Sequence, residues 1–240
     1  MGRITIPCVL ISLAMASATG AVEAGTGGGS GDSIHQFDFW GFSIAPEPQN
    51  MGDELRLVAV LSPGTTWVPI PLDFGANEYT VYLHGLVLRD RRLNGQLVQS
   101  TFKNGIAEIY GDPSFNAPFS HDTPATQVPP LDPAQVPAHF TDGELVVRFA
   151  ISRLTLLFYP QAGIGTVAYK DSDLKVVGGW AMDFLTEMSM LGGWHMGGGF
   201  TDESGTVPDG YGYLYDTLFK WESAQAVAPT SWGRIKANFK

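Results

Sequence analysis

The chain has 240 residues and a formal net charge of −10, from 14 Lys and Arg against 24 Asp and Glu. A surface with this excess of negative charge repels phosphate backbones, so we expect no nucleic-acid partner. The one cysteine, Cys8, lies in an N-terminal segment that we expect to be removed. Its removal would exclude disulfides and zinc–thiolate sites from the mature protein.

The N-terminus has the three parts of a secretory signal peptide. Arg3 supplies a positive charge, residues 4–16 form a mostly apolar run, and small residues follow. The run is shorter than the roughly 20 apolar residues that a membrane-spanning helix needs, and no later segment is long and apolar enough. We therefore predict a signal peptide over residues 1–24, cleaved after Ala18 or Ala24, and no membrane span.

A flexible linker is predicted next. Residues 25–33 read GTGGGSGDS, which is typical of Gly/Ser linkers. A phosphate-binding loop would need a Lys and a following helix, and neither is present. The folded domain is placed at residues 34–222.

The first part of this domain predicts short strands joined by turns. Residues 34–44 and 55–61 have strand composition, and 67–72 is an extended, proline-limited segment that suits a sheet edge. Residues 79–89 form the clearest strand, because β-branched and aromatic side chains run through them.

Two Asn-Gly pairs, Asn94-Gly95 and Asn104-Gly105, tolerate the positive φ angles of two-residue hairpin turns. The segments beside them, 96–103 and 106–110, have strand composition, so a β-meander is predicted. Residues 112–140 contain seven prolines and are predicted to form a long loop, pinned by its phenylalanines.

The second part of the domain continues the pattern. Residues 144–159 suit a helix or a long strand, and their content of Val, Ile, Thr, Phe and Tyr favours the strand. Residues 163–170 and 174–177 predict shorter strands, and 180–191 a strand or a short helix. In the last segment, 211–222, period-two alternation places five large side chains on one face. They are Tyr213, Tyr215, Thr217, Phe219 and Trp221.

Roughly nine to twelve strands without a run of good helices predict an all-β fold. The expected form is an antiparallel β-sandwich, with a β-barrel as the alternative and few or no long helices. Residues 223–240 form a linker and a basic tail in which Trp232, Ile235 and Phe239 would share one helical face. If this tail is a sorting or docking segment, deleting residues 230–240 should misplace the protein without unfolding it.

No catalytic arrangement is recognisable, so an enzyme is left open and a non-enzymatic role is favoured. The nearest approach to G-x-S-x-G lies in the linker and lacks its last glycine. Glu144, Asp183 and Glu187 suit a glycosidase cleft or solvent-facing positions, and the second is favoured. Five histidines show no zinc-site spacing, although the two that border the proline-rich loop could converge. They are His35, His84, His121, His139 and His195.

Calcium is the best cofactor candidate, because it takes oxygen ligands from loops. Asp171 and Asp173 give alternating carboxylates in a turn and are the predicted ligands, with Asp202-Glu203, Asp112 and Asp142 as further options. A turn-forming role also explains these aspartates, and it is favoured over calcium binding. No other cofactor is expected.

Three turn-sized motifs carry a resemblance. They are the Asn77–Thr80 strand start and the turns at 140–143 and 207–211, which occur with the signal peptide and a Thr-Ser-Trp-Gly-Arg-Ile-Lys tail. Together they resemble exported bacterial β-sandwich proteins without an assigned activity. The resemblance implies the fold and brings no catalytic residue. A chain exported without disulfides or Asn-x-Ser/Thr sequons also suits a bacterial envelope.

Two functions follow as hypotheses. The first is a secreted, periplasmic or cell-surface β module with a structural, adhesive or ligand-binding role and an envelope protein or glycan as partner. The alternative is a carbohydrate-binding or glycan-active protein, for which exposed tryptophans would supply stacking platforms. Burial of the tryptophans would remove the basis of the second hypothesis.

Overall fold

The computed structural model describes residues 35–64, 66, 68–169, 172–185, 193–202 and 207–221. The predicted signal peptide, linker and tail lie outside these residues, and so do Trp67, Asp171 and Glu187. Within the described ranges, no helix is long and apolar enough to cross a membrane.

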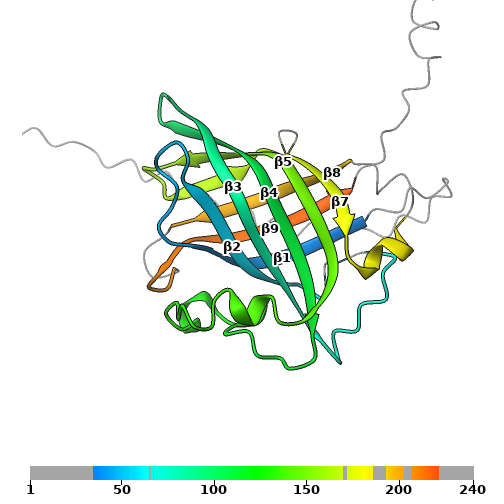
Figure 1. Cartoon of the computed structure of the whole chain (residues 1–240). Coiled ribbons are helices and arrows are strands. Elements are labelled where there is room, and N and C mark those ends of the chain that lie inside the picture. Colours follow the sequence, from blue (N-terminus) through cyan, green and yellow to red (C-terminus); the bar gives the residue numbers. More distant parts are fainter. Residues whose placement is uncertain are drawn as a thin grey trace, which may run out of the picture. The chain divides into compact units, whose positions relative to one another are not determined.

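Within the described residues, nine strands form the fold, and the helical segments are short pieces of 3₁₀ helix (Figure 1). The strands are β1 (His35–Ile44), β2 (Glu54–Leu61), β3 (Glu78–Asn94), β4 (Leu97–Asp112), β5 (Glu144–Tyr159), β6 (Ile164–Val167), β7 (Asp173–Gly178), β8 (Trp194–Thr201) and β9 (Tyr211–Trp221). The turns of 3₁₀ helix are η1 (Ala125–Gln127), η2 (Ala138–Phe140) and η4 (Trp180–Phe184).

All strand pairs are antiparallel, and the sheet closes into a ring. The order is β4-β3-β2-β1-β9-β8-β6-β5-β7, and further pairings join β4 to β5 and β7 to β8. The short strands β6 and β7 share one place between β5 and β8, because β6 pairs with one half of β5 and β7 with the other. The all-β antiparallel prediction is confirmed, and the sheet takes the closed form.

The interior of the ring is filled by alternate side chains of the strands. Phe37 and Phe39 of β1, Trp194 of β8 and Phe219 of β9 are buried there, and their rings pack on one another and on neighbouring aromatics. The period-two face predicted for the last strand is confirmed, since Tyr215 and other members of it point into this core.

A second hydrophobic cluster lies outside the ring, under the proline-rich segment 113–143. Phe42 and Val58 on the outer face of the sheet pack with Phe119 and Phe140 of that segment. The Thr80 hydroxyl also donates to the Phe140 carbonyl at 3.0 Å. The predicted loop is therefore a fixed cover over part of the outer face, whereas Phe115 is exposed rather than pinned.

The prediction of a hairpin turn at Asn104-Gly105 was wrong. Strand β4 runs through both residues, and the hairpin with β3 turns at Gly95 and the residue after it. Asn104 (φ 65°) and Gly85 (φ 71°) instead lie at an irregular position inside the two strands. At this position the alternation of inward-facing and outward-facing side chains shifts by one residue in both strands. Leu83 faces inward before this point, and Leu86 after it.

One further predicted strand is not formed, and for another segment the structure has the helical alternative. The described residues of 67–72 form no strand, because Pro69 and Pro71 remove ladder donors. Residues 180–184 form the 3₁₀ turn η4, and 186–192 lie outside the described ranges.

Candidate functional site

The strongest candidate site lies at one end of the ring. The C-terminal ends of β1, β3, β5 and β8 and the N-terminal ends of β2, β4 and β9 meet here. The segment 45–53, which joins β1 to β2, carries Glu47 into contact with this end. Its position is set by the buried Ser43 at the end of β1 and by Tyr213 near the start of β9.

Glu47 is half-buried and hydrogen-bonded from within the ring. The Ser43 hydroxyl donates to Glu47 Oε1, and the Tyr213 N–H donates both to Ser43 Oγ at 2.7 Å and to Glu47 Oε1 at 3.2 Å. Within the described part of the chain, both hydrogen bonds of Glu47 use Oε1, so Oε2 keeps its capacity to accept a hydrogen bond from a ligand.

Burial raises the pKa of Glu47 to about 7. The hydrogen bonds from Ser43 and from the Tyr213 N–H oppose this rise, and the negative charge of Asp202 adds to it. A carboxyl group with this pKa is present in both protonation states near neutral pH. Shifts of this kind concentrate at binding and catalytic sites.

The inner wall of the site is apolar and aromatic. The ring of Phe158 lies 5.8 Å from that of Phe200 and 5.0 Å from that of Tyr213, and Phe200 lies 5.3 Å from Tyr213. The cavity that they line with Glu47 has a volume of about 30 Å³, which is room for about one water molecule.

A buried hydroxyl group lies deeper along β9. The ring of Tyr215 stacks on Phe200 at 5.1 Å, and among the described residues its hydroxyl has no hydrogen-bond partner. Burial raises the pKa of Tyr215, and the charge of Glu47 contributes to the rise. An unpaired buried hydroxyl is costly, so Tyr215 is a strained polar position in the core next to the cavity-lining Phe200.

Glu47 also lines a wider depression on the outside of segment 45–53. This depression has a volume of about 440 Å³, and three carboxylates and one guanidinium line it. Its lining residues are Pro46, Glu47, Gln49, Asn50, Asp53, Glu54 and Arg56. Two of the carboxylates are occupied: Asp53 accepts from the N–H groups of Gln49 and Asn50, and Glu54 accepts from that of Gly85.

One side chain holds this segment to the sheet. Arg91 of β3 donates to the Pro48 carbonyl at 3.4 Å and to the Gln49 carbonyl at 3.2 Å, and it also contacts Gln49 Oε1. Arg91 therefore positions the wall that separates the inner cavity from the outer depression. Glu47 belongs to both spaces.

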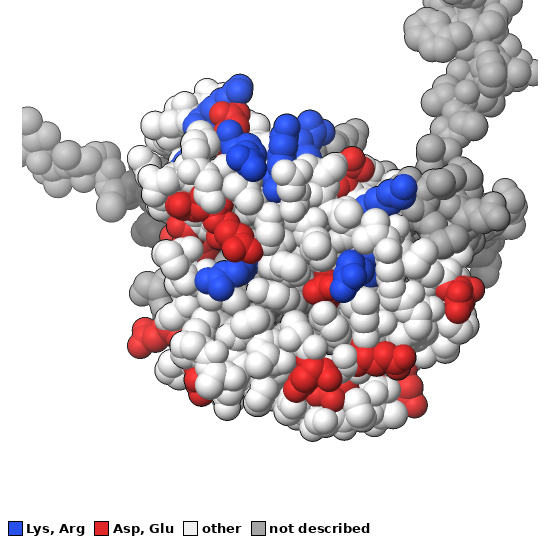
Figure 2. Space-filling model, in the orientation of Figure 1, with Lys and Arg blue, Asp and Glu red and all other residues white. Residues whose placement is uncertain are grey.

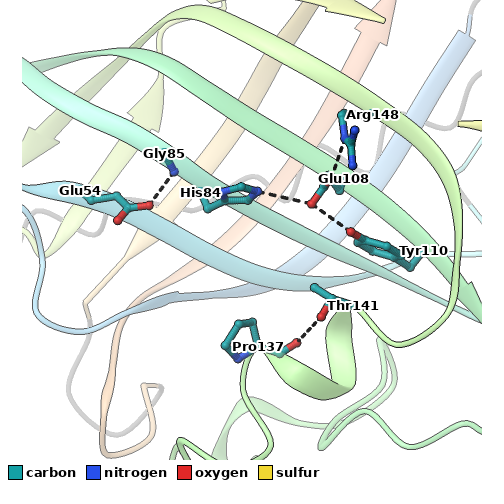
Figure 3. Close-up of polar contacts among 8 residues, drawn as sticks. All are labelled: Glu54, His84, Gly85, Glu108, Tyr110, Pro137, Thr141 and Arg148. Carbon is teal, nitrogen blue, oxygen red and sulfur yellow. Dashed lines mark hydrogen bonds and ion pairs between the residues drawn. The ribbon is translucent and has the colours of Figure 1, made fainter. Parts of the chain in front are cut away.

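A second polar cluster lies on the outer face of β3, β4 and β5 (Figure 3). Glu108 accepts from Arg148 Nε at 2.6 Å and from the Tyr110 hydroxyl at 3.0 Å, and His84 Nε2 lies 3.4 Å from it. The His84 ring in turn stacks on Tyr82.

Glu108 is chemically the opposite of Glu47. Burial alone would raise the pKa of Glu108, but hydrogen bonds from Arg148 and Tyr110 and the Arg148 charge outweigh burial and hold the pKa below its ordinary value. A carboxylate that stays ionised with both oxygens occupied suits a structural clamp across three strands rather than proton transfer.

The predicted site residues are dispersed. Asp173 starts β7, where its Oδ2 accepts from Ser152 at 2.6 Å, and Asp171 lies outside the described residues. Glu144 and Asp183 are exposed at the start of β5 and in η4. Over the described ranges, no three His, Cys, Asp or Glu side chains form a group that could hold a metal ion.

The histidines have separate partners. His121 pairs with Asp122 at 3.1 Å, while His139 Nδ1 lies 2.9 Å from the Asn116 carbonyl. His195 Nδ1 lies 2.6 Å from the Ser172 carbonyl. Buried His35 packs beside Trp221, and burial lowers its pKa.

None of the described tryptophans is fully exposed. Trp194 is fully buried, and Trp40, Trp180 and Trp221 are half-buried against other rings. Glu47 was missed from the sequence, where only its position between two prolines after a strand marks it.

No protein-family model, curated protein or solved structure matches this chain.

Proposed function

We propose that the protein is an exported ligand-binding β module that binds a small organic cation beside Glu47. The observation that carries this proposal is the position of Glu47, which lines both an aromatic cavity and a polar depression. Ligand pockets typically combine apolar walls with a few polar groups that fix orientation.

A cation is favoured over other ligands by the charges near the site. Three carboxylates line the outer depression against one arginine, and Asp202 adds a negative charge near Glu47. The rings of Phe158, Phe200 and Tyr213 add faces that attract cations. The chain as a whole carries a net charge of −10, which raises the local concentration of cations.

The size of the inner cavity defines how the ligand would enter. A cavity of about 30 Å³ does not admit a ring, so the ammonium group would meet Glu47 from the outer depression. An apolar body would reach the aromatic rings only if the segment held by Arg91 moved aside. Arg91 is then a positioning residue for the binding site.

The test compares 2-phenylethylamine with its neutral analogue 2-phenylethanol by isothermal titration calorimetry. We expect the amine to bind more tightly at about pH 8, where Glu47 is ionised, than at about pH 5.5. At a pH between these values, binding of the amine should release a proton from the Glu47 carboxyl group. Glu47→Gln should weaken amine binding at least about tenfold and leave the alcohol unaffected.

Asp173→Asn is the matched control, since it removes the same charge from a distant strand. It should leave amine binding unchanged. Equal affinity for the amine and the alcohol, or unchanged binding in Glu47→Gln, would contradict the proposal.

Export remains part of the proposal and rests on the N-terminal sequence. The carbohydrate-binding alternative has less support, because each tryptophan in the described ranges is buried or half-buried against other rings. A module that has no disulfides and binds a small molecule suits a role in the bacterial envelope or outside the cell.

A further inference from the structure

Carboxylates gather at the end of the ring opposite Glu47. Glu78 at the start of β3 lies directly across from Asp112 at the end of β4. Directly opposed residues of an antiparallel pair share one face, and like charges in such positions are destabilising. Figure 2 shows acidic side chains along this lower edge, whereas the upper part of the view carries both acidic and basic side chains.

The segment 113–143 adds a third carboxylate and an amide. Asn116 Nδ2 donates to Asp142 Oδ2 at 2.9 Å, and the Ala117 N–H donates to Glu78 Oε1 at 2.8 Å. The charges of Asp112 and Asp142 both act on Glu78. Within the described part of the chain, no Lys, Arg or His forms an ion pair with any of the three carboxylates.

Two buried oxygen atoms in this cluster are unpaired. Asp112 is only 4% exposed, its Oδ1 accepts from the Ser114 N–H at 2.9 Å, and its Oδ2 has no partner among the described residues. Asn116 Oδ1 is likewise buried without a partner there. Burying a carboxylate oxygen and an amide oxygen without donors is costly, unless a cation or a water molecule satisfies them.

The residue types suit calcium. Carboxylate, amide and main-chain oxygens are its usual ligands, and it accepts six to eight of them in irregular loops. Asp112, Ser114 and Asn116 alternate along the chain from the last residue of β4, and Asp142 returns to the same place at the end of the loop. Magnesium is less suited, because it demands near-octahedral geometry and retains several waters.

We propose that Asp112, Asn116 and Asp142, with Glu78 beside them, bind a calcium ion that fastens the proline-rich segment 113–143 to the ends of β3 and β4. Because the acidic side chains do not by themselves form a metal-binding group of three in the described ranges, Asn116, main-chain oxygens and water must supply the remaining ligands. The site lies away from Glu47 and is independent of the proposed function.

The experiment uses the full mature protein, with thermal unfolding followed in EGTA and in CaCl₂ or MgCl₂. Calcium should raise Tm by several degrees, and calorimetry should show one site. Asp112→Asn should weaken calcium binding at least about tenfold and abolish the Tm shift. In EGTA this variant should melt at or above the wild-type Tm, because it relieves the repulsion with Glu78; a misfolded variant would melt below it.

Asp173→Asn serves as the control, since it removes a carboxylate from the other calcium candidate. It should keep the full calcium response. The proposal is overturned if the wild-type Tm is the same in EGTA and CaCl₂ with no heat of binding, or if Asp173→Asn abolishes the response and Asp112→Asn does not.

Discussion

Glu47 accepts hydrogen bonds from a serine hydroxyl and a main-chain N–H, whereas Glu108 accepts them from an arginine and a tyrosine. Both carboxyl groups lose water on folding, but only Glu108 gains a positive partner. Burial therefore dominates at Glu47 and raises its pKa, while the arginine decides the direction at Glu108.

The Glu47→Gln substitution should change how stability depends on pH. The pKa of Glu47 rises from 4.5 in the unfolded chain to about 7 in the folded protein. Between these values the unfolded chain has lost a proton that the folded protein keeps, so the free energy of unfolding falls as the pH rises. The substitution removes this loss.

Thermal unfolding from about pH 4.5 to about pH 8 measures this effect. We expect the Tm of Glu47→Gln minus that of the wild type to increase by several degrees across the window. All other titrating groups are common to both proteins and cancel in the difference. A difference that stays constant with pH would contradict the raised pKa of Glu47.

Neither glutamate could be singled out from the sequence. Glu108 lies in a strand of ordinary alternating composition, and its partner Arg148 is 40 residues away. Glu47 and its hydrogen-bond partner Tyr213 are 166 residues apart in the chain. Contacts at these separations depend on how the strands are ordered, which local residue patterns do not encode.

At the scale of the elements, the outer face of β3, β4 and β5 carries a cross-strand row. Tyr82, Glu108 and Arg148 are direct neighbours across the three strands, in that order. Opposite charges in such positions stabilise an antiparallel sheet, and the charge-assisted hydrogen bond at 2.6 Å strengthens the pair.

The Glu108→Gln substitution tests this row. It should lower the free energy of unfolding by about 1–2 kcal/mol, because the buried carboxylate is replaced and Arg148 loses its partner. Chemical denaturation measures this change. Arg92→Gln provides the comparison: its ion pair with Asp90 is exposed, so the loss should be under about 1 kcal/mol. Equal losses in the two variants would mean that the row contributes no more than a surface pair.

Strand positions were largely predictable, because local composition and alternation suffice for them. The bounds 144–159 predicted for β5 agree with the structure, and those of β1, β2 and β9 agree within one residue. One departure from the prediction has a clear physical reason. Asn104-Gly105 has the residues of a turn, and the same positive φ angles also suit an irregular position inside a long strand.

At the scale of the whole molecule, export can be tested directly. Expression of the full chain in a bacterial host should yield a processed protein outside the cytoplasm that begins at Thr19 or Gly25. N-terminal sequencing and intact mass measure this. Leu10→Arg, which interrupts the apolar run, should leave the precursor uncleaved, and a wild-type protein that keeps Met1 in the cytoplasm would contradict the prediction.

Ring closure could not be predicted from local residue patterns, because the composition and alternation of the strands are the same in an open sandwich and in a closed sheet. Closure depends on the pairing of β4 with β5 across the proline-rich segment and on β6 and β7 dividing one place between them. The candidate site follows from closure, since the strand ends that surround Glu47 come together only in the ring.

The pairing of β1 with β9 has a practical consequence for orientation. His35 at the start of β1 is the direct neighbour of Trp221 at the end of β9. Both ends of the folded sheet therefore emerge at the same rim, and Glu47 lies at the far rim. A surface attached at His35 or Trp221 would therefore meet the rim of the sheet away from Glu47 and leave the Glu47 rim facing the surrounding solution.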